Sequence, residues 1–312
     1  MKKGLISLVA LIASVKRKRL VCASFYLMSC FLSISAQIKL SFNPEKGVKY
    51  EYQMEVVQNM KQNAMGQEIP IETEMNGTYL MEIKNKTPQE IHAESTYQGF
   101  TFIVSSPMMK IKYDSKNPTE NPSEMDKMFG KMFSTLIGKP FTVVFSPDGS
   151  VKSVSGMGAI IESMLGAISS DGQVAAQMGG LMTQQFSDES MRKMFEQSFN
   201  FYPDKAVKVG ESWNTEITMP MNNMNFGIKT KNTLKEVSNK MATIEVTGDI
   251  DMDMGEGKFS GTQTGTMIVD TTTGMPVTSD VSLNLKGSIK AQGMEIQMEL
   301  VQKTKTTTKA IR

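Results

Sequence analysis

Alternation of apolar and polar side chains near the start of the chain most constrains what this sequence can fold into. Between residues 50 and 56, Tyr, Met and Val occupy the even positions, and Glu or Gln the odd ones. The alternation recurs less regularly over 75–83 and 91–104. A period of two with one polar face predicts antiparallel strands that are covered on one side. We therefore expect strands over residues 38–115.

The middle of the chain changes to helical patterns. From Met125 to Ile137, apolar residues recur at steps of three and four, after a cap at Asn121 or Ser123 and before Gly138. This spacing predicts an amphipathic helix. Three further helices are expected at about 157–168, 173–186 and 188–200, the last of them capped by Ser187 or Asp188. A hairpin is expected between the first two helices, with strands at 141–145 and 151–154 around Pro147-Asp148-Gly149.

Strands resume at Val207 and continue to the end, and the two strand-rich parts share landmarks in the same order. The paired segments are 48–52 with 209–213, 81–86 with 234–240, and 144–151 with 268–277. The alternative is that any two β-meanders would share such features. With duplication, we predict an α+β fold, mostly antiparallel β: two related curved sheet halves, about 38–156 and 207–309, with a helical insert at about 121–200 packed over one face.

The first 36 residues are typical of an export signal. A basic block at 16–19 precedes an uncharged apolar run, Leu20 to Ile34, which ends at Ala36. This pattern predicts a signal peptide over 1–36, a start codon near Val15 and a single β-rich domain over 37–312, exported to the periplasm or cell envelope. Leu27-Met28-Ser29-Cys30 also resembles a lipobox, which would make Cys30 a lipid anchor. The apolar run continues past Cys30, which favours ordinary cleavage.

Removal of this segment changes the charge and the cysteine content of the chain. Six of the 34 basic residues and none of the 32 acidic residues lie within it, so 28 basic and 32 acidic residues remain, a net charge of −4. That balance gives no reason to expect nucleic-acid binding. Both cysteines, Cys22 and Cys30, are lost as well. We therefore expect no disulfide, no thiol chemistry and no transmembrane helix in the mature chain.

The residues left do not form a recognisable catalytic or metal motif. His92 is the only histidine and lies on the polar side of an expected strand. One His without Cys does not provide a typical zinc site. Asp249, Asp251 and Asp253 resemble the start of a calcium loop, but Met254 and Ser260 replace the Gly and Glu that such a loop needs at its sixth and twelfth positions. We interpret them as the polar face of a strand, and a weak surface calcium site is the alternative. We expect a non-catalytic protein without a cofactor or metal.

Methionine is the unusual feature of the composition, with 26 of 28 in the mature chain. Met is flexible and polarizable and lines adaptable apolar surfaces. We therefore predict an apolar ligand, a lipid, an acyl chain or a lipidated protein, in a Met-rich cavity. The predicted lining residues come from the helical insert: Met125, Met128, Phe129, Met132, Phe133, Met191, Met194 and Phe195. Two alternatives remain open. One is a structural or interaction protein of the cell envelope, and the other binds Cu(I) through thioethers.

Three segments together carry a resemblance to a known family. They are the run from Pro203 to Trp213, the hairpin Ser146-Pro-Asp-Gly-Ser-Val151, and Asp270-Thr-Thr-Thr-Gly-Met-Pro276. The chain resembles an uncharacterised family of exported β-rich bacterial proteins, defined as a domain of unknown function. That family provides no activity, cofactor or catalytic residue to transfer. The architecture is also similar to the periplasmic lipoprotein-carrier fold, a curved sheet with helices over an apolar cavity, by fold analogy alone.

Overall fold

A computed structural model describes residues 37–64, 66–168, 187–221, 224–253, 257–291 and 294–311. All of them belong to one compact unit, Gln37–Arg312. The predicted signal peptide, with its possible anchor at Cys30, and the predicted helix at 173–186 lie outside the described residues.

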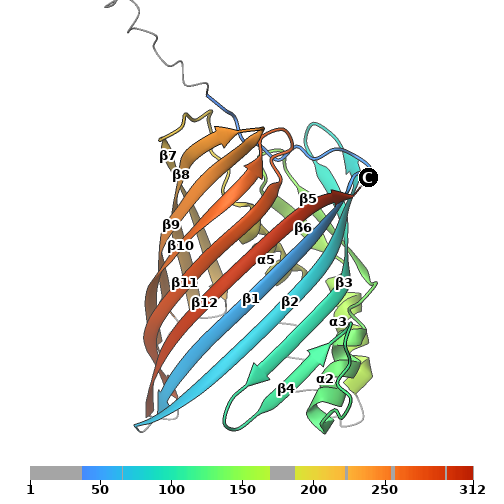
Figure 1. The fold of residues 1–312 in the computed structure, drawn as a ribbon, viewed down its shortest axis with the longest axis vertical. Helices are drawn as coiled ribbons and strands as arrows, with labels where there is room; N and C mark the ends of the chain where they lie inside the picture. Colours follow the sequence, from blue (N-terminus) through green and yellow to red (C-terminus); the bar gives the residue numbers. More distant parts are fainter. Residues whose placement is uncertain are drawn as a thin grey trace, which may run out of the picture. The chain divides into compact units, whose positions relative to one another are not determined.

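Within these ranges, twelve strands form one curved antiparallel sheet (Figure 1). The sheet order is β6-β5-β3-β2-β1-β12-β11-β10-β9-β8-β7, and β4 pairs with β3 beside β5. The predicted fold class, α+β and mostly antiparallel β, is confirmed. The two strand-rich parts join into one sheet through β12, which pairs with both β1 and β11. The strands are β1 Lys49–Ala64, β2 Gln67–Lys86, β3 Ile91–Ser105, β4 Lys110–Asp114, β5 Pro140–Phe145, β6 Val151–Ser155, β7 Ser212–Met221, β8 Met224–Ser238, β9 Met241–Asp253, β10 Gly257–Asp270, β11 Pro276–Ala291 and β12 Met294–Ile311.

Side-chain alternation gives the sheet an inner and an outer face. On β1, Tyr50 and Val56 are buried, whereas Val57 is 47% exposed. On β12, every even position from Met294 to Thr308 is half-buried and every odd position is exposed. Directly opposed residues of antiparallel strands point to the same face, so the register extends this division across the sheet. The even positions of β1 and β12 therefore belong to the inner face.

Glycines concentrate along the β10–β11 ladder, on the inner face. Gly257, Gly261 and Gly265 of β10 oppose Ile289, Leu285 and Val281, and Gly287 of β11 opposes Phe259. A Cβ at Gly261 would collide with the Asn284 carbonyl, and one at Gly265 with the Asp280 carbonyl. Neighbouring backbone thus occupies the space that a side chain would need. We call these four residues the glycine seam, and it lets β10 and β11 approach closely on the inner side, as strongly bent sheets require.

Three helices are described: α2 Glu124–Ser134, α3 Met157–Ile168 and α5 Asp188–Phe199. Ser123 caps α2, and Ser187 caps α5 by accepting a hydrogen bond from the Ser190 N–H, so both predicted caps are present. Helix α2 ends before its predicted limit at Ile137. There Ile137 forms a parallel bridge to Tyr97, and the Gly138 N–H, at φ +76°, donates to the Tyr97 carbonyl at 2.9 Å. Pairing with β3 therefore replaces the last helical turn.

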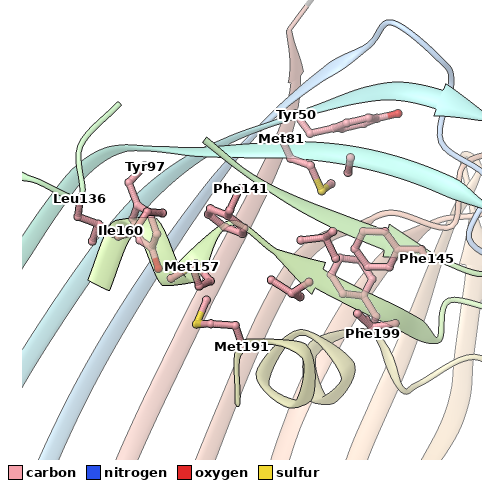
Figure 2. Packing of buried hydrophobic residues seen from close by; sticks show 14 of the residues in the cluster. Tyr50, Met81, Tyr97, Leu136, Phe141, Phe145, Met157, Ile160, Met191 and Phe199 are labelled. Carbon is pink, nitrogen blue, oxygen red and sulfur yellow. The ribbon is translucent and has the colours of Figure 1, made fainter. Parts of the chain in front are cut away.

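The helices pack on one end of the sheet, where α5 contacts β6 and α2 contacts α3 and β4. Their buried residues share one core with the inner faces of β1, β2, β3, β5 and β6 (Figure 2). Phe145 lies at 4.9 Å from Phe199 of α5 and 4.7 Å from Phe42, measured between ring centroids. The prediction of a helical insert over one face is confirmed by this arrangement.

The segment before β1 connects this core with a second one. Ile38 forms an antiparallel bridge to Val207, and the Asn43 N–H donates to the Thr273 carbonyl at 2.7 Å. Leu40 belongs to a buried cluster with Leu234 and Ile244, whereas Phe42 belongs to the helix-covered core. Residues 38–43 therefore link the second strand-rich part to the first.

Local irregularities repeat between the two strand-rich parts. The Gly47 N–H donates to the Ile83 carbonyl at 2.8 Å, and the Gly210 N–H donates to the Leu234 carbonyl at 2.7 Å. Each ladder to the following strand shifts register directly after this acceptor residue. By this criterion Leu234 of the second part corresponds to Ile83 of the first. The sequence comparison had aligned Leu234 with Met81, two residues earlier. Duplication itself stays a prediction.

Candidate functional site

The eight residues predicted to line a cavity lie in the helix-covered core or on its surface. Met132, Phe133 and Met191 are buried there, and Met128, Phe129 and Phe195 pack against it half-buried. Met125 and Met194 are 38% and 40% exposed. The ring of Phe133 lies 4.9 to 5.9 Å from those of Phe100, Phe102, Tyr113 and Phe129. Six of the eight thus meet in one packed cluster, and their role as cavity lining stays a prediction.

Two pockets lie elsewhere among the described residues, and none of those eight lines either. A groove of about 660 Å³ crosses β7 to β10 and is lined largely by exposed, outward-facing residues. Along it, Lys229 opposes both Glu216 and Asp249. Alternating opposite charges are typical of a solvated sheet face. A smaller pocket of about 130 Å³ lies among Glu45, Tyr50, the β10–β11 turn and the end of β12.

A half-buried apolar surface occupies the inner face of β11, β12, β1 and β2, at the ends of the strands remote from the helix-covered core. In one row of the register, Ile71 opposes Met60, Met60 opposes Leu300, and Leu300 opposes Leu285. Leu285 and Leu300 pack with Ile228 and Ile250 in a small buried cluster. Six other members are half-buried and belong to none of the three buried clusters. We call these six the apolar zone: Met60, Ile69, Ile71, Ile289, Ile296 and Met298.

A row of polar side chains borders the apolar zone on the side of the helices. Gln302 of β12 opposes Gln58 of β1, and Gln58 opposes Thr73 of β2. Gln302 donates to the Thr304 hydroxyl at 3.2 Å. No hydrogen bond from the side chain of Gln58 or Thr73 is found within the described part of the chain. We call Gln58, Thr73 and Gln302 the polar belt.

Beyond the belt, three tyrosines form a row on the inner face. Tyr52 opposes Tyr79, and Tyr79 opposes Tyr97. The rings of Tyr79 and Tyr97 lie 4.4 Å apart between centroids. Burial raises the pKa of Tyr97 to about 12 and raises the pKa values of Tyr52 and Tyr79 well above the ordinary value of 10.0. These hydroxyls are therefore neutral hydrogen-bonding groups, which are unsuited to act as bases near neutral pH.

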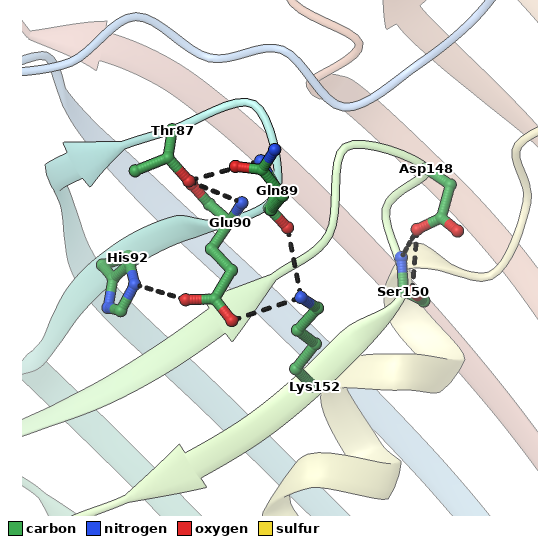
Figure 3. A network of polar contacts seen from close by, with 7 residues as sticks. All are labelled: Thr87, Gln89, Glu90, His92, Asp148, Ser150 and Lys152. Atoms are coloured by element: carbon green, nitrogen blue, oxygen red, sulfur yellow. Dashed lines mark hydrogen bonds and ion pairs between the residues drawn. The ribbon is translucent and has the colours of Figure 1, made fainter.

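The remaining polar candidates lie on the outer face or at its turns. His92 contacts Glu90 at 3.1 Å, and Glu90 also binds Lys152 at 3.2 Å in a partly exposed network (Figure 3). The Lys152 ammonium is the main cause of the lowered Glu90 pKa. These contacts link the start of β3 with β6 on the outer face.

Asp249 and Asp251 are exposed on β9, as predicted for a polar strand face. Within the described ranges, no group of three or more His, Cys, Asp or Glu residues could hold a metal ion. The Cu(I) alternative would draw on closely spaced methionines such as Met219, Met221 and Met224, whose side chains lie outside the described residues. None of the three helices is long and apolar enough to cross a membrane.

Fold and inner face together define a class: a mostly antiparallel β protein with one long curved sheet, partly covered by helices on its inner face. The chain belongs to a family of unknown function, DUF6263, whose model matches residues 89–276, from the β2–β3 turn to the start of β11. The predicted membership of such a family is confirmed. No curated protein matches the chain.

Solved structures resemble the chain at low sequence identity. A structure concerning lipid–protein interactions in lipovitellin matches 86% of this chain at 7% identity with a TM-score of 0.47, and this chain spans 26% of the lipovitellin chain. The COG4313 outer membrane channel from Pseudomonas putida F1 matches 86% of this chain and 97% of its own at 7% identity, with a TM-score of 0.25. OccK7 from Pseudomonas aeruginosa matches 85% and 100%, at 6% identity and a TM-score of 0.24.

Sequence reasoning missed the apolar zone and the polar belt. Both were within reach, because Met60 and Gln58 continue the even positions of a strand whose alternation is evident. The missing element was the pairing of β12 with β1, which brings Leu300 and Gln302 beside them. That pairing joins residues more than 200 positions apart, and no local pattern specifies it.

Proposed function

We propose that this protein is an exported, non-catalytic binding protein that holds an apolar ligand, a lipid or acyl chain, against the apolar zone. The observation that carries the proposal is the incomplete cover of Met60, Ile69, Ile71, Ile289, Ile296 and Met298. Six apolar side chains face inward, yet none joins a buried cluster of the described part of the chain.

Energetics support an apolar occupant. Burying apolar surface stabilises by about 25 cal/mol per Å², so half-buried Ile and Met side chains retain binding energy that a ligand can use. The methionines add adaptability, because a thioether chain accommodates ligands of irregular shape. The helix-covered core offers less apolar surface to a ligand, because its aromatic rings already pack against one another. Their centroids lie 4.4 to 6.4 Å apart.

Export is the second part of the proposal and rests on the basic block, apolar run and small residue within positions 16–36. N-terminal sequencing of the protein from its own cells tests it directly. We expect a mature chain that begins at Gln37. Retention of Met1 would exclude cleavage. A mature chain that begins at a lipid-modified Cys30 would show that the protein is a lipid-anchored protein and is not cleaved after Ala36.

Ligand binding is tested with protein purified from its own envelope, followed by native mass spectrometry and solvent extraction of bound lipid. In parallel, the uncharged fluorescent probe N-phenyl-1-naphthylamine is titrated into delipidated protein. The key variant is Met60→Glu, which places a charge in the apolar zone. We expect its dissociation constant for the probe to rise about tenfold or more, because a buried Met side chain contributes about 1.5–3 kcal/mol.

Val57→Glu is the matched control on the same strand, since Val57 points outward and is 47% exposed. It should bind the probe as the wild type does. Met298→Gln serves as a milder second variant should Met60→Glu fail to fold. Equal binding by wild type, Met60→Glu and Met298→Gln would exclude the apolar zone as the site, and absence of both extracted lipid and probe binding would refute the proposed function.

A further inference from the structure

We infer that the ligand is an uncharged amphiphile, whose apolar chain lies on the apolar zone and whose hydroxyl- or carbonyl-bearing head meets the polar belt. The inference rests on the proposed function and specifies the chemical class of its ligand. Its basis is the order of surfaces along β1 and β2: apolar zone, polar belt, then the tyrosine row and the helix-covered core.

Among the described residues, no charged side chain lies beside the apolar zone or the polar belt on the inner face of β1, β2, β11 and β12. Acidic and basic side chains of β1 and β12, such as Glu55, Lys61, Glu299 and Lys303, occupy odd positions and point outward. The same division holds in β2 and β11, where Glu72 and Lys286 point outward. A carboxylate or phosphate brought to this face would lose water without meeting a cation, which is costly.

The belt offers neutral hydrogen-bonding groups in place of charges. Gln58 and Thr73 lie side by side, and the side chain of Gln58 is half-buried and forms no hydrogen bond that the described residues account for. An amide supplies two donors and a carbonyl acceptor, and a hydroxyl supplies one donor and an acceptor. Such groups match hydroxyls and ester carbonyls, and leaving them unpaired on ligand binding would cost free energy.

The belt is also placed at the correct end of the zone for an amphiphile. From the end of β1 toward its start, the successive inner-face residues are Met60, Gln58 and the buried Val56. Beyond Val56 the inner face is closed by the tyrosine row and the helix core. On the other side of Met60, the Gln62 amide donates a hydrogen bond to Met60 Sδ at 3.9 Å. A chain can therefore extend along the zone away from the belt, while the head stops at Gln58 and Gln302.

The test compares two ligands with the same chain, monooleoylglycerol and oleate, at pH 8, where oleate is ionised. Each displaces N-phenyl-1-naphthylamine from the full-length mature protein. We expect monooleoylglycerol to bind at least about tenfold more tightly than oleate, because the anion meets no cation. Gln58→Lys should reverse this preference by giving the carboxylate a partner, whereas Gln53→Lys should leave it unchanged, since Gln53 is exposed on the outer face of the same strand.

Gln302→Lys repeats the test from the neighbouring strand should Gln58→Lys fail to fold. Equal affinity for the two ligands, or tighter binding of oleate by the wild type, would overturn the inference. The proposed function would still stand in that case, provided that the probe binds. Reversal of the preference by Gln53→Lys as well as by Gln58→Lys would assign the effect to overall charge and also overturn it. Failure of the probe and both ligands to bind would refute the proposed function itself.

Discussion

Leu285 lies directly opposite Gly261 across the β10–β11 ladder, and its Cδ2 atom would be 2.8 Å from a Cβ placed on that glycine. The Asn284 carbonyl would lie closer still. Leu285 in turn packs with Ile228 and Ile250. Absence of a side chain at Gly261 is thus what lets β10 approach β11 closely and lets a leucine cover the seam.

Gly261→Ala should therefore destabilise the fold, although alanine is ordinarily tolerated in a strand better than glycine. We expect a loss of about 1–3 kcal/mol in the free energy of unfolding, typical of overpacking against backbone. Urea unfolding followed by the fluorescence of Trp213, whose indole N–H donates to the Phe201 carbonyl at 2.8 Å, measures it.

Gly158→Ala is the control for this substitution, because nothing lies within 4 Å of a Cβ at Gly158 in helix α3. It should leave stability unchanged or raise it by up to about 1 kcal/mol, since alanine is the better helix former. Equal stability of Gly261→Ala and wild type would show that the seam is not required for the bend.

Local patterns in the sequence were sufficient for most elements but not for the sheet. Ser123 and Ser187 are recognisable as caps because capping needs only a side-chain oxygen and the following N–H groups. The glycine seam had a signal too: Gly257, Gly261 and Gly265 recur at steps of four, which places them on one face of a strand. Their partner strand is set by tertiary pairing, and periodicity carries no information on that.

The candidate site was predictable in composition but not in place. Methionine and phenylalanine on helix α2 satisfy equally well a packed core and a ligand surface. Which one results depends on whether rings from other strands, such as Phe100 and Phe102, arrive opposite Phe133. In the apolar zone the residue types are similar, but none of the six side chains joins a buried cluster of the described residues.

Asp126 links helix α2 to strand β4, and its loss should weaken that link in a pH-dependent way. Its carboxylate accepts hydrogen bonds from the Lys112 N–H at 2.6 Å and the Ser123 N–H at 2.8 Å. The Lys112 N–H is the main cause that holds the Asp126 pKa below its ordinary value of 3.8. Because the carboxylate is favoured in the folded state, Asp126 stabilises the fold above about pH 4. This contribution is lost as the pH falls through the lowered pKa of Asp126.

The variant Asp126→Asn should lower the melting temperature at pH 7 and flatten its decline between about pH 4 and pH 2, since the group that titrates is gone. Thermal unfolding by circular dichroism at several pH values measures both effects. Asp249→Asn, which removes an exposed carboxylate on β9, should keep the wild-type profile. A wild-type acid profile in Asp126→Asn would show that the Lys112 contact contributes nothing to stability.

At alkaline pH the tyrosine row should limit stability. Burial keeps Tyr52, Tyr79 and Tyr97 neutral in the folded protein, with the Tyr97 pKa at about 12, whereas an unfolded tyrosine ionises near 10. A raised tyrosine pKa means that stability is fully present below pH 10 and declines as pH rises above it. Absorbance at 295 nm should therefore show these tyrosines ionising late and together with unfolding.

Tyr97→Phe tests the sign of this dependence, because it removes the ionisable group while keeping the ring. We expect a smaller loss of stability between about pH 10 and pH 12 than in wild type. Tyr113→Phe is the comparison, since Tyr113 is less deeply buried than Tyr97. Ionisation of all tyrosines near pH 10 without unfolding would contradict burial of the row.

Helix α2 allows a packed core to be distinguished from a ligand-lined surface by two methionines of the same helix. Met132 is 3% exposed within the helix-covered core, whereas Met125 is 38% exposed. Met132→Ala should lower the free energy of unfolding by about 2–5 kcal/mol, as expected for truncation in a filled core. Met125→Ala should change it by no more than about 0.5 kcal/mol. Chemical denaturation of lipid-free protein gives both values. A loss below about 1 kcal/mol for Met132→Ala would indicate that its surroundings are not filled in the free protein, and would return helix α2 to consideration as part of the ligand surface.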